Sequence, residues 1–282
     1  MGLRINTNLM AIQAQRHLYN ATLRVQKSME RLSSGLRINR AADDPAGLAI
    51  SERLKSQIAA LEVANRNAAD GISLVQVAEG ALDSVSDLLI RMKELTMQSR
   101  NGTVSDQQRT YLDAEFQTLM EEITRIGNAT EFNGTNLLDG SQGALAIQVG
   151  VGAGDTVDID LGIDGTSAGL GVDGSDILTS AGAAGAADLL DAAMDRVAGH
   201  RARLGASQNR FESIIRMNAN LGENLSAANS RIRDVDVAKE MAELISAQIM
   251  QQAAVAVLAQ ANYQPQLILR LLDASFGYGP RR

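Results

Sequence analysis

The two ends of this chain carry a helical repeat that restricts its fold more than any other feature. Near the C-terminus apolar or small residues recur at alternating steps of three and four, at Leu190, Ala193, Val197, His200, Leu204, Ser207, Phe211, Ile214, Asn218, Leu221, Leu225, Ala228, Ile232 and Val235. The same steps run near the N-terminus through Ala11, Ala14, Leu18, Ala21, Val25, Ser28 and Leu32. This spacing is typical of helices that bury one narrow seam against another helix. The sequence therefore predicts that its two ends pair, with each other or with neighbouring copies.

Composition agrees with narrow helical seams and argues against nucleic acid as a partner. Aromatic residues make up only 3% of the chain and Trp is absent, whereas compact cores usually gain much of their buried area from aromatics. The net charge is −7. Nucleic-acid binding requires a basic footprint, which this overall charge does not favour. The charge is uneven, because residues 1–60 sum to +5 and the remainder to −12.

No uninterrupted apolar run approaches the roughly 20 residues of a membrane span. The longest is AAVAVLA at residues 253–259, and the N-terminus has no apolar signal-peptide core. We therefore expect no membrane insertion and, if the protein leaves the cell, no cleaved secretory signal. Cysteine is absent, so neither a disulfide framework nor thiolate chemistry is expected.

Capping residues divide the first half of the chain into three predicted helices. One covers residues 6–33 and ends at Gly35, and a long second one begins at Pro45, behind Asp44 as N-cap, and runs to about Ser99. Ser105 caps a third helix that ends at Gly127, and a turn follows at residues 132–134.

The second half changes period and then returns to helix. Apolar residues alternate over about 144–161, which predicts a β-hairpin. Residues 162–185 are rich in small and polar residues and predict a solvent-exposed loop. A long helix then runs from Ala186 to about Asn262, where Pro265 stops it, and Gly199, Gly205 and Gly222 are candidate sites of a bend.

These elements predict a mainly α fold, a long antiparallel helical coiled-coil or bundle rod with a small β-hairpin. We expect residues 1–44 and 236–282 to form one discontinuous terminal coiled-coil domain. Residues 45–235 would form a helical rod domain that carries the hairpin at about 144–161 and a short variable loop at 162–185.

Motifs for chemistry are nearly absent, so we expect no enzyme, no cofactor and no metal. His17 and His200 are far apart in sequence and fit no metal-ligand spacing. The glycine-rich stretch at 150–154 lies between two predicted strands, where a hairpin turn is the better interpretation than a phosphate loop.

Two segments identify a protein family far more specifically than the helical periodicity does. The first is SSGLRINRAADDPAGLAI at residues 33–50, preceded by INTN at residues 5–8. The second combines Ser230–Ile232, Asp234, Asp236, Ala238 and Glu240 with QQ at 251–252, VLAQAN at 257–262 and PQ at 265–266. Over about residues 3–140 and 186–272 the chain closely resembles bacterial flagellin, the subunit of the flagellar filament.

The resemblance implies a structural protein that assembles with many copies of itself into an extracellular motility filament. It implies export through the flagellar type III apparatus, a secretion chaperone that holds the C-terminal helix, and contacts with hook-associated junction and cap proteins. It also implies packing of the terminal helices into a coiled coil. We expect Leu18, Val25, Leu32, Leu244, Ile249, Val255 and Leu258 to carry that packing.

Flagellins also share a surface that a Toll-like receptor senses. Residues 89–98 resemble it, with Arg91 and Leu95 aligned on receptor-contacting positions and Glu115 on the next helix. Ile90 stands where receptor-binding members often carry Gln. Subunit packing is the alternative role for these residues.

Three alternative functions remain at this stage. A hook–filament junction protein shares related termini. An extracellular enzyme would need a larger insert, and a non-flagellar coiled-coil adhesin would not need the two terminal motifs.

Overall fold

The computed structural model describes residues 7–276, with side chains for residues 7–266, and resolves them into two compact units. Unit 1 contains the chain up to Lys55 together with the chain from Ser226 onward, and unit 2 is Ser56–Leu225. Long helices dominate both, so the predicted mainly α fold is confirmed. The predicted domain division stays a prediction.

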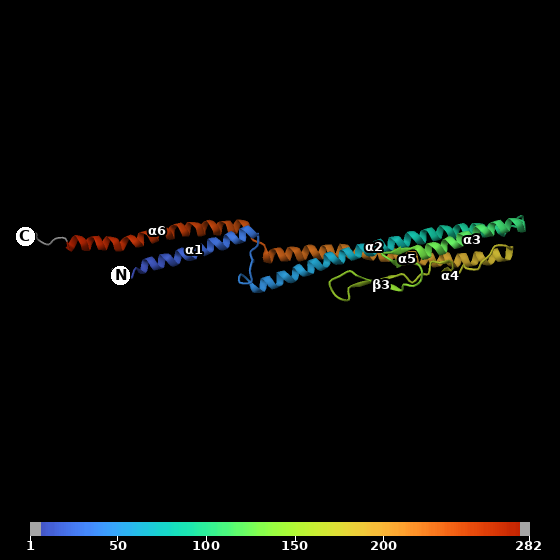
Figure 1. The fold of residues 1–282 in the computed structure, drawn as a ribbon, viewed down its shortest axis with the longest axis horizontal. Helices are drawn as coiled ribbons and strands as arrows, with labels where there is room; N and C mark the ends of the chain where they lie inside the picture. Colours follow the sequence, from blue (N-terminus) through green and yellow to red (C-terminus); the bar gives the residue numbers. More distant parts are fainter. Residues whose placement is uncertain (1–6, 277–282) are drawn as a thin grey trace, which may run out of the picture. The chain divides into compact units, whose positions relative to one another are not determined.

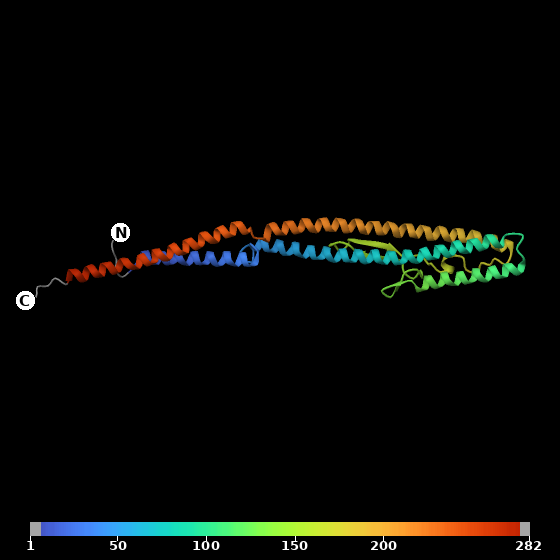
Figure 2. The same ribbon diagram turned by 90° about the horizontal axis from the view of Figure 1, so that it is seen from above.

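Unit 1 is an antiparallel pair of helices joined to the ends of two longer ones. Helix α1 (Leu9–Ser34) lies along α6 (Val237–Phe276) in both views of the ribbon (Figures 1 and 2). The beginning of α2 (Pro45–Ser99) and the end of α5 (Ser180–Arg233) complete the unit. The main chain also pairs across it, because Leu36 and Asp234 form an antiparallel bridge.

The helix boundaries follow from local chemistry. Asn8 caps α1 by accepting a hydrogen bond from the Ala11 amide at 3.1 Å, and Gly35 ends the helix with φ 70°, a left-handed conformation that glycine adopts without strain. Asp44 accepts from the Gly47 amide at 2.9 Å and so caps α2 as predicted. Ser105 and Gln108 form a reciprocal capping box at the start of α3 (Asp106–Ala129).

Unit 2 holds the apolar core. Its elements are the remainder of α2 and α5, helix α3, the short α4 (Ser167–Leu170) and two antiparallel hairpins. The largest fully buried side chains all lie here, and they are Phe116, Phe211, Leu82, Leu89, Met92, Leu95, Ile123, Leu137, Leu138, Ile159, Leu161 and Leu170. Ion pairs join α2 to α5, among them Arg201 with Asp83 at 2.8 Å and Lys93 with Asp191.

The predicted hairpin is confirmed as β3 (Ala144–Gln148) paired with β4 (Thr156–Asp160). Two amides hold its turn end: Asn67 of α2 donates to the Gln148 carbonyl at 3.1 Å, and the buried Asn218 of α5 donates to the Val149 carbonyl at 2.8 Å. A second hairpin, β1 (Glu131–Phe132) with β2 (Thr135–Asn136), surrounds the predicted turn. Asn133 and Gly134 both have positive φ, which is the backbone geometry of a tight hairpin turn.

The expectation of an exposed loop at 162–185 was wrong. Ile163, Leu170, Val172 and Ile177 are all buried in the core of unit 2. These four apolar residues are spread thinly among glycine and serine, and short turns, including α4, bring them to one side. Composition averaged over the segment concealed them.

The single helix expected from Ala186 to Asn262 was also wrong. The chain leaves helix between Arg233 and Val237, and α5 begins already at Ser180. The Asp236 side chain accepts from the amides of Ala238 and Lys239 and so starts α6 anew. Gly199, Gly205 and Gly222 lie within an unbroken α5, and α6 continues through Pro265.

Candidate functional site

The seam between α1 and α6 is built from small side chains at intervals of seven residues. Ala14, Ala21 and Ser28 are the buried residues of α1. On the facing helix α6 the buried residues include Leu244, Ala247, Ala254 and Ala261. Small residues let the two backbones approach closely, but they bury little apolar area per residue. The seam therefore sets the register of the helices more than it stabilises them.

Polar side chains tie the seam together at three levels. The Gln251 amide donates to the Thr22 hydroxyl at 3.1 Å near the middle of the pair. Toward the loop end, Arg31 Nη1 lies 3.4 Å from Glu240 Oε2. These contacts fix the antiparallel register, because a shift by one residue would break both.

The third tie joins Asn8 to α6 at the turn that contains Pro265. Proline has no N–H, so the carbonyl of residue 261 lacks the donor that residue 265 normally supplies in a helix. The Asn8 side-chain amide donates to that Ala261 carbonyl at 2.7 Å. The same side chain caps α1 through its oxygen. This contact explains in part why α6 passes through Pro265 rather than ending there.

The residues expected to pack the terminal helices fall into two groups. Leu244 is buried, and Leu18, Val25, Leu32 and Leu258 are half-buried along the α1–α6 pair. Ile249 and Val255 face outward instead, with 61% and 51% of their surface exposed. Packing against other copies stays a prediction for all seven residues, and the exposed surface of Ile249 and Val255 is available for it.

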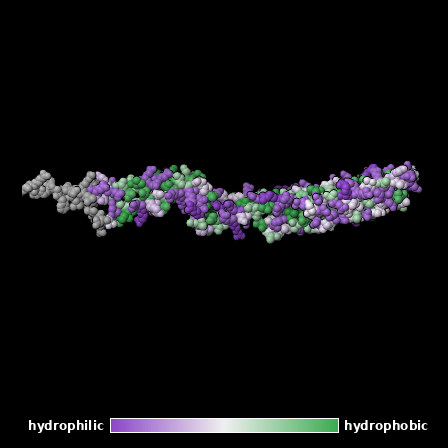
Figure 3. All heavy atoms as spheres, in the orientation of Figure 1, coloured by the Kyte–Doolittle hydropathy of each residue, from purple (hydrophilic) through white to green (hydrophobic). Residues whose placement is uncertain are grey.

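Large apolar side chains cover the outer faces of the same helices. On α6 the exposed set is Val237, Met241, Ile245, Ile249, Met250, Val255, Val257 and Tyr263, and on α1 it is Leu9, Met10, Ile12, Tyr19, Leu23 and Met29. Figure 3 shows hydrophobic surface over this part of the molecule. By length and mean hydropathy alone, residues 237–266 of α6 match a membrane span, and only 11% of that window is buried in the described structure. The expectation of no membrane insertion stays a prediction.

The loop between α1 and α2 is held by charge. Lys27 Nζ lies 2.8 Å from Asp43 Oδ1, and this contact is the main reason that the pKa of Asp43 lies below its usual value. Asp43 also accepts from the backbone amides of Asn39 and Arg40. Arg233 at the end of α5 pairs with Glu52 of α2 at 2.6 Å.

The candidate receptor-sensing residues lie in unit 2, and only two of them reach the surface. Arg91 of α2 binds Glu115 of α3 through Nη2 at 2.8 Å and Glu94 through Nη1 at 2.9 Å. These two carboxylates raise the pKa of the Arg91 guanidinium, with Glu115 the larger cause. Leu95 is 1% exposed and belongs to the core.

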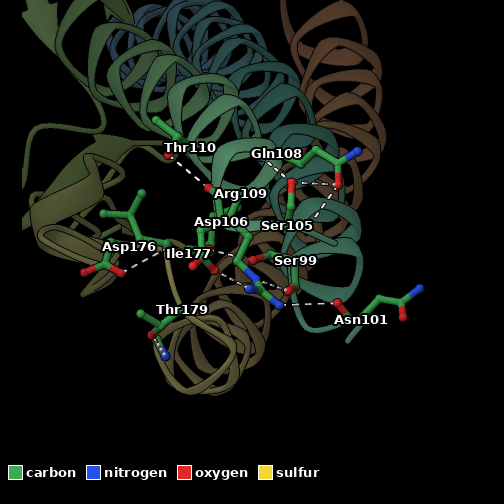
Figure 4. Close-up of polar contacts among 12 residues, drawn as sticks. Ser99, Asn101, Ser105, Asp106, Gln108, Arg109, Thr110, Asp176, Ile177 and Thr179 are labelled. Atoms are coloured by element: carbon green, nitrogen blue, oxygen red, sulfur yellow. Dashed lines mark hydrogen bonds and ion pairs between the residues drawn. The ribbon is translucent and has the colours of Figure 1, made fainter. Parts of the chain in front are cut away.

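Arg109 of α3 binds the end of α2, a contact that the sequence did not predict. Its Nε donates to the Ser99 carbonyl at 3.0 Å and its Nη2 to the Asn101 carbonyl at 3.4 Å, while Nη1 pairs with Asp106 (Figure 4). A cation at this position interacts favourably with the negative end of the helix. Ser99 also donates to the Ile177 carbonyl at 2.6 Å, so the cluster fixes the 162–185 segment as well.

Among the described residues, no group of three or more His, Cys, Asp or Glu residues is placed to hold a metal ion. His200 on the seam of α5 has a pKa below its usual value, first because of burial and then because of Arg203. Asp160 accepts from the Gly162 amide and pairs with Arg203, and these two contacts, the first being the larger cause, lower its pKa.

Two family models match the sequence. The bacterial flagellin N-terminal helical region matches residues 5–143, and the bacterial flagellin C-terminal helical region matches residues 187–272. These ranges nearly coincide with those over which the sequence motifs carry the resemblance.

Whole-length relatives agree with the family models. A flagellin of Halalkalibacterium halodurans is 49% identical over 269 residues, which cover 95% of this chain and 99% of the relative. A flagellin of Bacillus subtilis is 44% identical over 96% of this chain and all of the relative. The flagellar filament 33 kDa core protein of Treponema phagedenis is 44% identical over 95% and 99%.

The fold also occurs among solved structures. A flagellar hook-associated protein from Vibrio parahaemolyticus superposes with a TM-score of 0.58 at 18% identity, covering 68% of this chain and all of that one. At this identity the likeness concerns the fold alone.

Proposed function

Because the chain belongs to the bacterial flagellin family, we propose that it is a structural subunit that polymerises with copies of itself into the extracellular filament of the flagellum. One observation of the structure carries the proposal: the apolar outer faces of α1 and α6 are uncovered. An apolar helix face is normally packed against another element. Here α1 covers one side of α6, which leaves the remainder for further copies.

Exposed apolar patches of this kind mark interaction surfaces. When a surface binds a different surface on the next copy and the arrangement does not close, the product is a helical polymer. Many repeated contacts then add up, so the weak burial within one subunit is no obstacle to a stable filament. Cofactors and catalytic groups have no part in this role.

The experiment is seeded polymerisation of purified chain, followed by light scattering and electron microscopy. The variant Ile245→Ser with Ile249→Ser removes two side chains that are 50% and 61% exposed, so it leaves the α1–α6 seam intact. We expect filaments from the unaltered chain and none from this variant. Val151→Ser, at an exposed apolar residue in the hairpin turn, is the matched control and should polymerise. Absence of filaments from the unaltered chain contradicts the proposal.

We further propose that export uses the flagellar type III apparatus and that a secretion chaperone covers α6 beforehand. The support is the exposed apolar face of α6, which would be exposed to water before polymerisation unless another protein bound it. Junction and cap proteins related in fold would then join the two ends of the polymer. Fusing residues 1–44 to a reporter tests the export step, because secretion should stop in cells whose flagellar apparatus is disabled.

Recognition by a Toll-like receptor is a separate proposal that rests on Arg91 and Glu115. Their side chains meet at the surface, where a partner has access to both. Arg91→Ala should weaken the response of receptor-expressing reporter cells to monomer. Arg125→Ala is the matched control, because Arg125 makes a similar exposed pair with Glu122 on α3. Equal responses to both variants would remove Arg91 from the receptor surface.

A further inference from the structure

The tripeptide Asn–Gly–Thr occurs at residues 101–103 and again at residues 133–135. An asparagine that precedes glycine is open to deamidation, in which the next backbone nitrogen attacks the side-chain carbonyl, because glycine has no Cβ to hinder the approach. The local chemistry of the two tripeptides is the same. Their surroundings in the folded chain differ, and these decide which asparagine reacts.

The first tripeptide lies in the connection between α2 and α3. Residues 101–103 are all exposed, and the Gly102 amide donates no hydrogen bond within the described residues 7–266. A Cβ added at Gly102 would meet nothing within 4 Å, so the space beside this nitrogen is open. Water therefore has access to the groups that would react.

Hydrogen bonds activate both of these groups. The Thr103 amide donates to Asn101 Oδ1 at 3.2 Å, which closes a ring that contains the 101–102 peptide bond and holds the side chain against it. The same donor stabilises the negative charge that develops on Oδ1 during the attack. The Asn101 main-chain carbonyl accepts from the Val104 amide at 3.1 Å and from Arg109 Nη2 at 3.4 Å (Figure 4). This carbonyl is conjugated with the Gly102 nitrogen, so both donors favour the deprotonated nitrogen that attacks.

The second tripeptide is held in another way. Asn133 and Gly134 form the turn of the β1–β2 hairpin with φ values of 51° and 76°, and Phe132 pairs with Thr135 directly across the turn. Closing a ring at Asn133 would rotate a backbone that this pairing fixes on both sides. No hydrogen bond to the Asn133 side chain forms within residues 7–266, so its carbonyl lacks the activation found at Asn101.

We propose that Asn101 is a site of spontaneous deamidation in the folded chain and that Arg109 accelerates the reaction. The Gly102 nitrogen gives up its proton and bonds to Asn101 Cγ. The Cγ–Nδ2 bond then breaks, and ammonia leaves with the proton. Water opens the resulting succinimide at one of its two carbonyls. Opening at Cγ yields aspartate, and opening at the main-chain carbonyl yields isoaspartate.

Arg109 also stabilises the second product. In isoaspartate the former main-chain carbonyl carbon of residue 101 carries a free carboxylate, while the chain continues through Cγ. Arg109 Nη2, which donates to that carbonyl in the unreacted chain, then faces a carboxylate and forms a charge-assisted hydrogen bond. The inference goes beyond the filament proposal and does not depend on it, because every group involved belongs to one chain.

The first test follows ageing of the purified full chain at mildly alkaline pH by peptide mass spectrometry. In water enriched in heavy oxygen, each deamidation that occurs during the experiment incorporates one labelled atom. We expect Asn101 to react about tenfold faster than Asn133 in the folded chain, and the two rates to converge in denaturant. Isoaspartate and aspartate should both form at residue 101. Equal rates in the folded chain, or aspartate as the sole product, would overturn the proposal.

The second test changes the activating groups one at a time. Arg109→Gln should slow the reaction at Asn101 by about fivefold, and Arg109→Lys, which keeps the positive charge, should restore part of the rate. Arg125→Gln is the matched control on the same helix, because Arg125 pairs only with the exposed Glu122 in the described structure, and its rate should be unchanged. An Arg109→Gln variant that reacts at the unaltered rate or faster would remove Arg109 from the reaction.

Gly102→Ala tests the attacking atom without disturbing the fold, since the added methyl group has room. The methyl group hinders the approach of the nitrogen to Cγ, so we expect the rate at Asn101 to fall about tenfold. An unchanged rate would show that the Gly102 nitrogen is not the nucleophile and would overturn the proposal.

Discussion

At the scale of single residues, Asn8 performs two tasks that the sequence pattern cannot reveal. Its oxygen caps α1, and its amide nitrogen satisfies the Ala261 carbonyl at the proline turn of α6. The cap was predictable in kind, since Asn is a preferred N-cap. The second contact spans 253 positions, and no local pattern connects the two partners. For that reason the sequence predicted that Pro265 ends the helix, whereas in the structure Pro265 lies within α6.

Asn8→Asp separates these two tasks. The aspartate keeps a capping oxygen but has no N–H to donate, so the Ala261 carbonyl loses its partner. We expect a net cost of about 1 kcal/mol, or roughly fivefold faster amide exchange in α1 and α6 of the polymerised chain. Hydrogen exchange followed by mass spectrometry measures this.

The control is the same substitution in a Pro265→Ala background. Alanine restores the missing backbone N–H to Ala261, so Asn8→Asp should then cost little. An equal cost in both backgrounds would show that Asn8 acts only as a cap.

His200 gives unit 2 a pH dependence with a defined sign. Its pKa is lowered in the folded chain, mainly by burial, so the unfolded chain binds more protons below the usual value of about 6.5. Stability should therefore fall as pH drops through that region. Asp160, whose pKa is also lowered, contributes stability that is present above its usual value and is lost only below about pH 4. Denaturant unfolding between about pH 3 and pH 7.5 separates the two, and His200→Gln should flatten the upper window only.

At the scale of elements, the prediction from sequence was best where a helix boundary has its own chemistry. Pro45, Ser99 and Ser105 mark boundaries that the structure reproduces, because caps act within a few residues. The seam steps along α5 are also reproduced, with Leu190, Val197 and Phe211 buried. The prediction of an exposed loop at 162–185 was wrong because the burial of Ile163 and Ile177 depends on contacts with residues distant in sequence, in the core of unit 2. In the candidate site, the small-residue seam was visible in the pattern, whereas the Arg31–Glu240 contact was not.

A glycine within α5 can be replaced by alanine with a gain in stability where the added methyl group has room. A Cβ added at Gly199 would meet nothing within 4 Å. Gly199→Ala should therefore stabilise unit 2 by about 1 kcal/mol in denaturant unfolding. Gly127→Ala is the opposing case, because its Cβ would lie 3.0 Å from the Thr166 backbone nitrogen, and it should destabilise. A loss of stability in both variants would refute the distinction.

The α1–α6 pair should be marginal in a free subunit, because its seam buries mostly alanine. We expect limited proteolysis of dilute monomer to cut within α1 and α6 and to leave a resistant fragment that contains residues 56–225. The same sites should be protected in filaments. Protection of α1 and α6 in dilute monomer would contradict this expectation.

At the scale of the whole molecule, stability is divided unequally between the two units. All of the largest fully buried side chains belong to residues 56–225, whereas unit 1 buries chiefly small ones. The monomer should therefore lose helix in two thermal steps, and unit 2 should melt second. Phe211→Ala removes a fully buried ring at a cost of about 3–5 kcal/mol, which lowers the second midpoint by roughly 6–20 °C. Circular dichroism should show the first step unchanged, and a shift of both steps would mean that the units melt together.

The pairing of α1 with α6 also imposes a delay between the synthesis of α1 and its packing. Roughly 200 residues separate the two helices, and at about 5–20 residues per second a ribosome needs roughly 10–40 s to make them. Throughout that interval the first helix has been synthesised and its partner has not. During that time its apolar side chains Leu9, Met10 and Ile12 are either exposed to water or covered by another protein. Helix α1 is thus made long before α6 but can pack against it only after α6 has been synthesised.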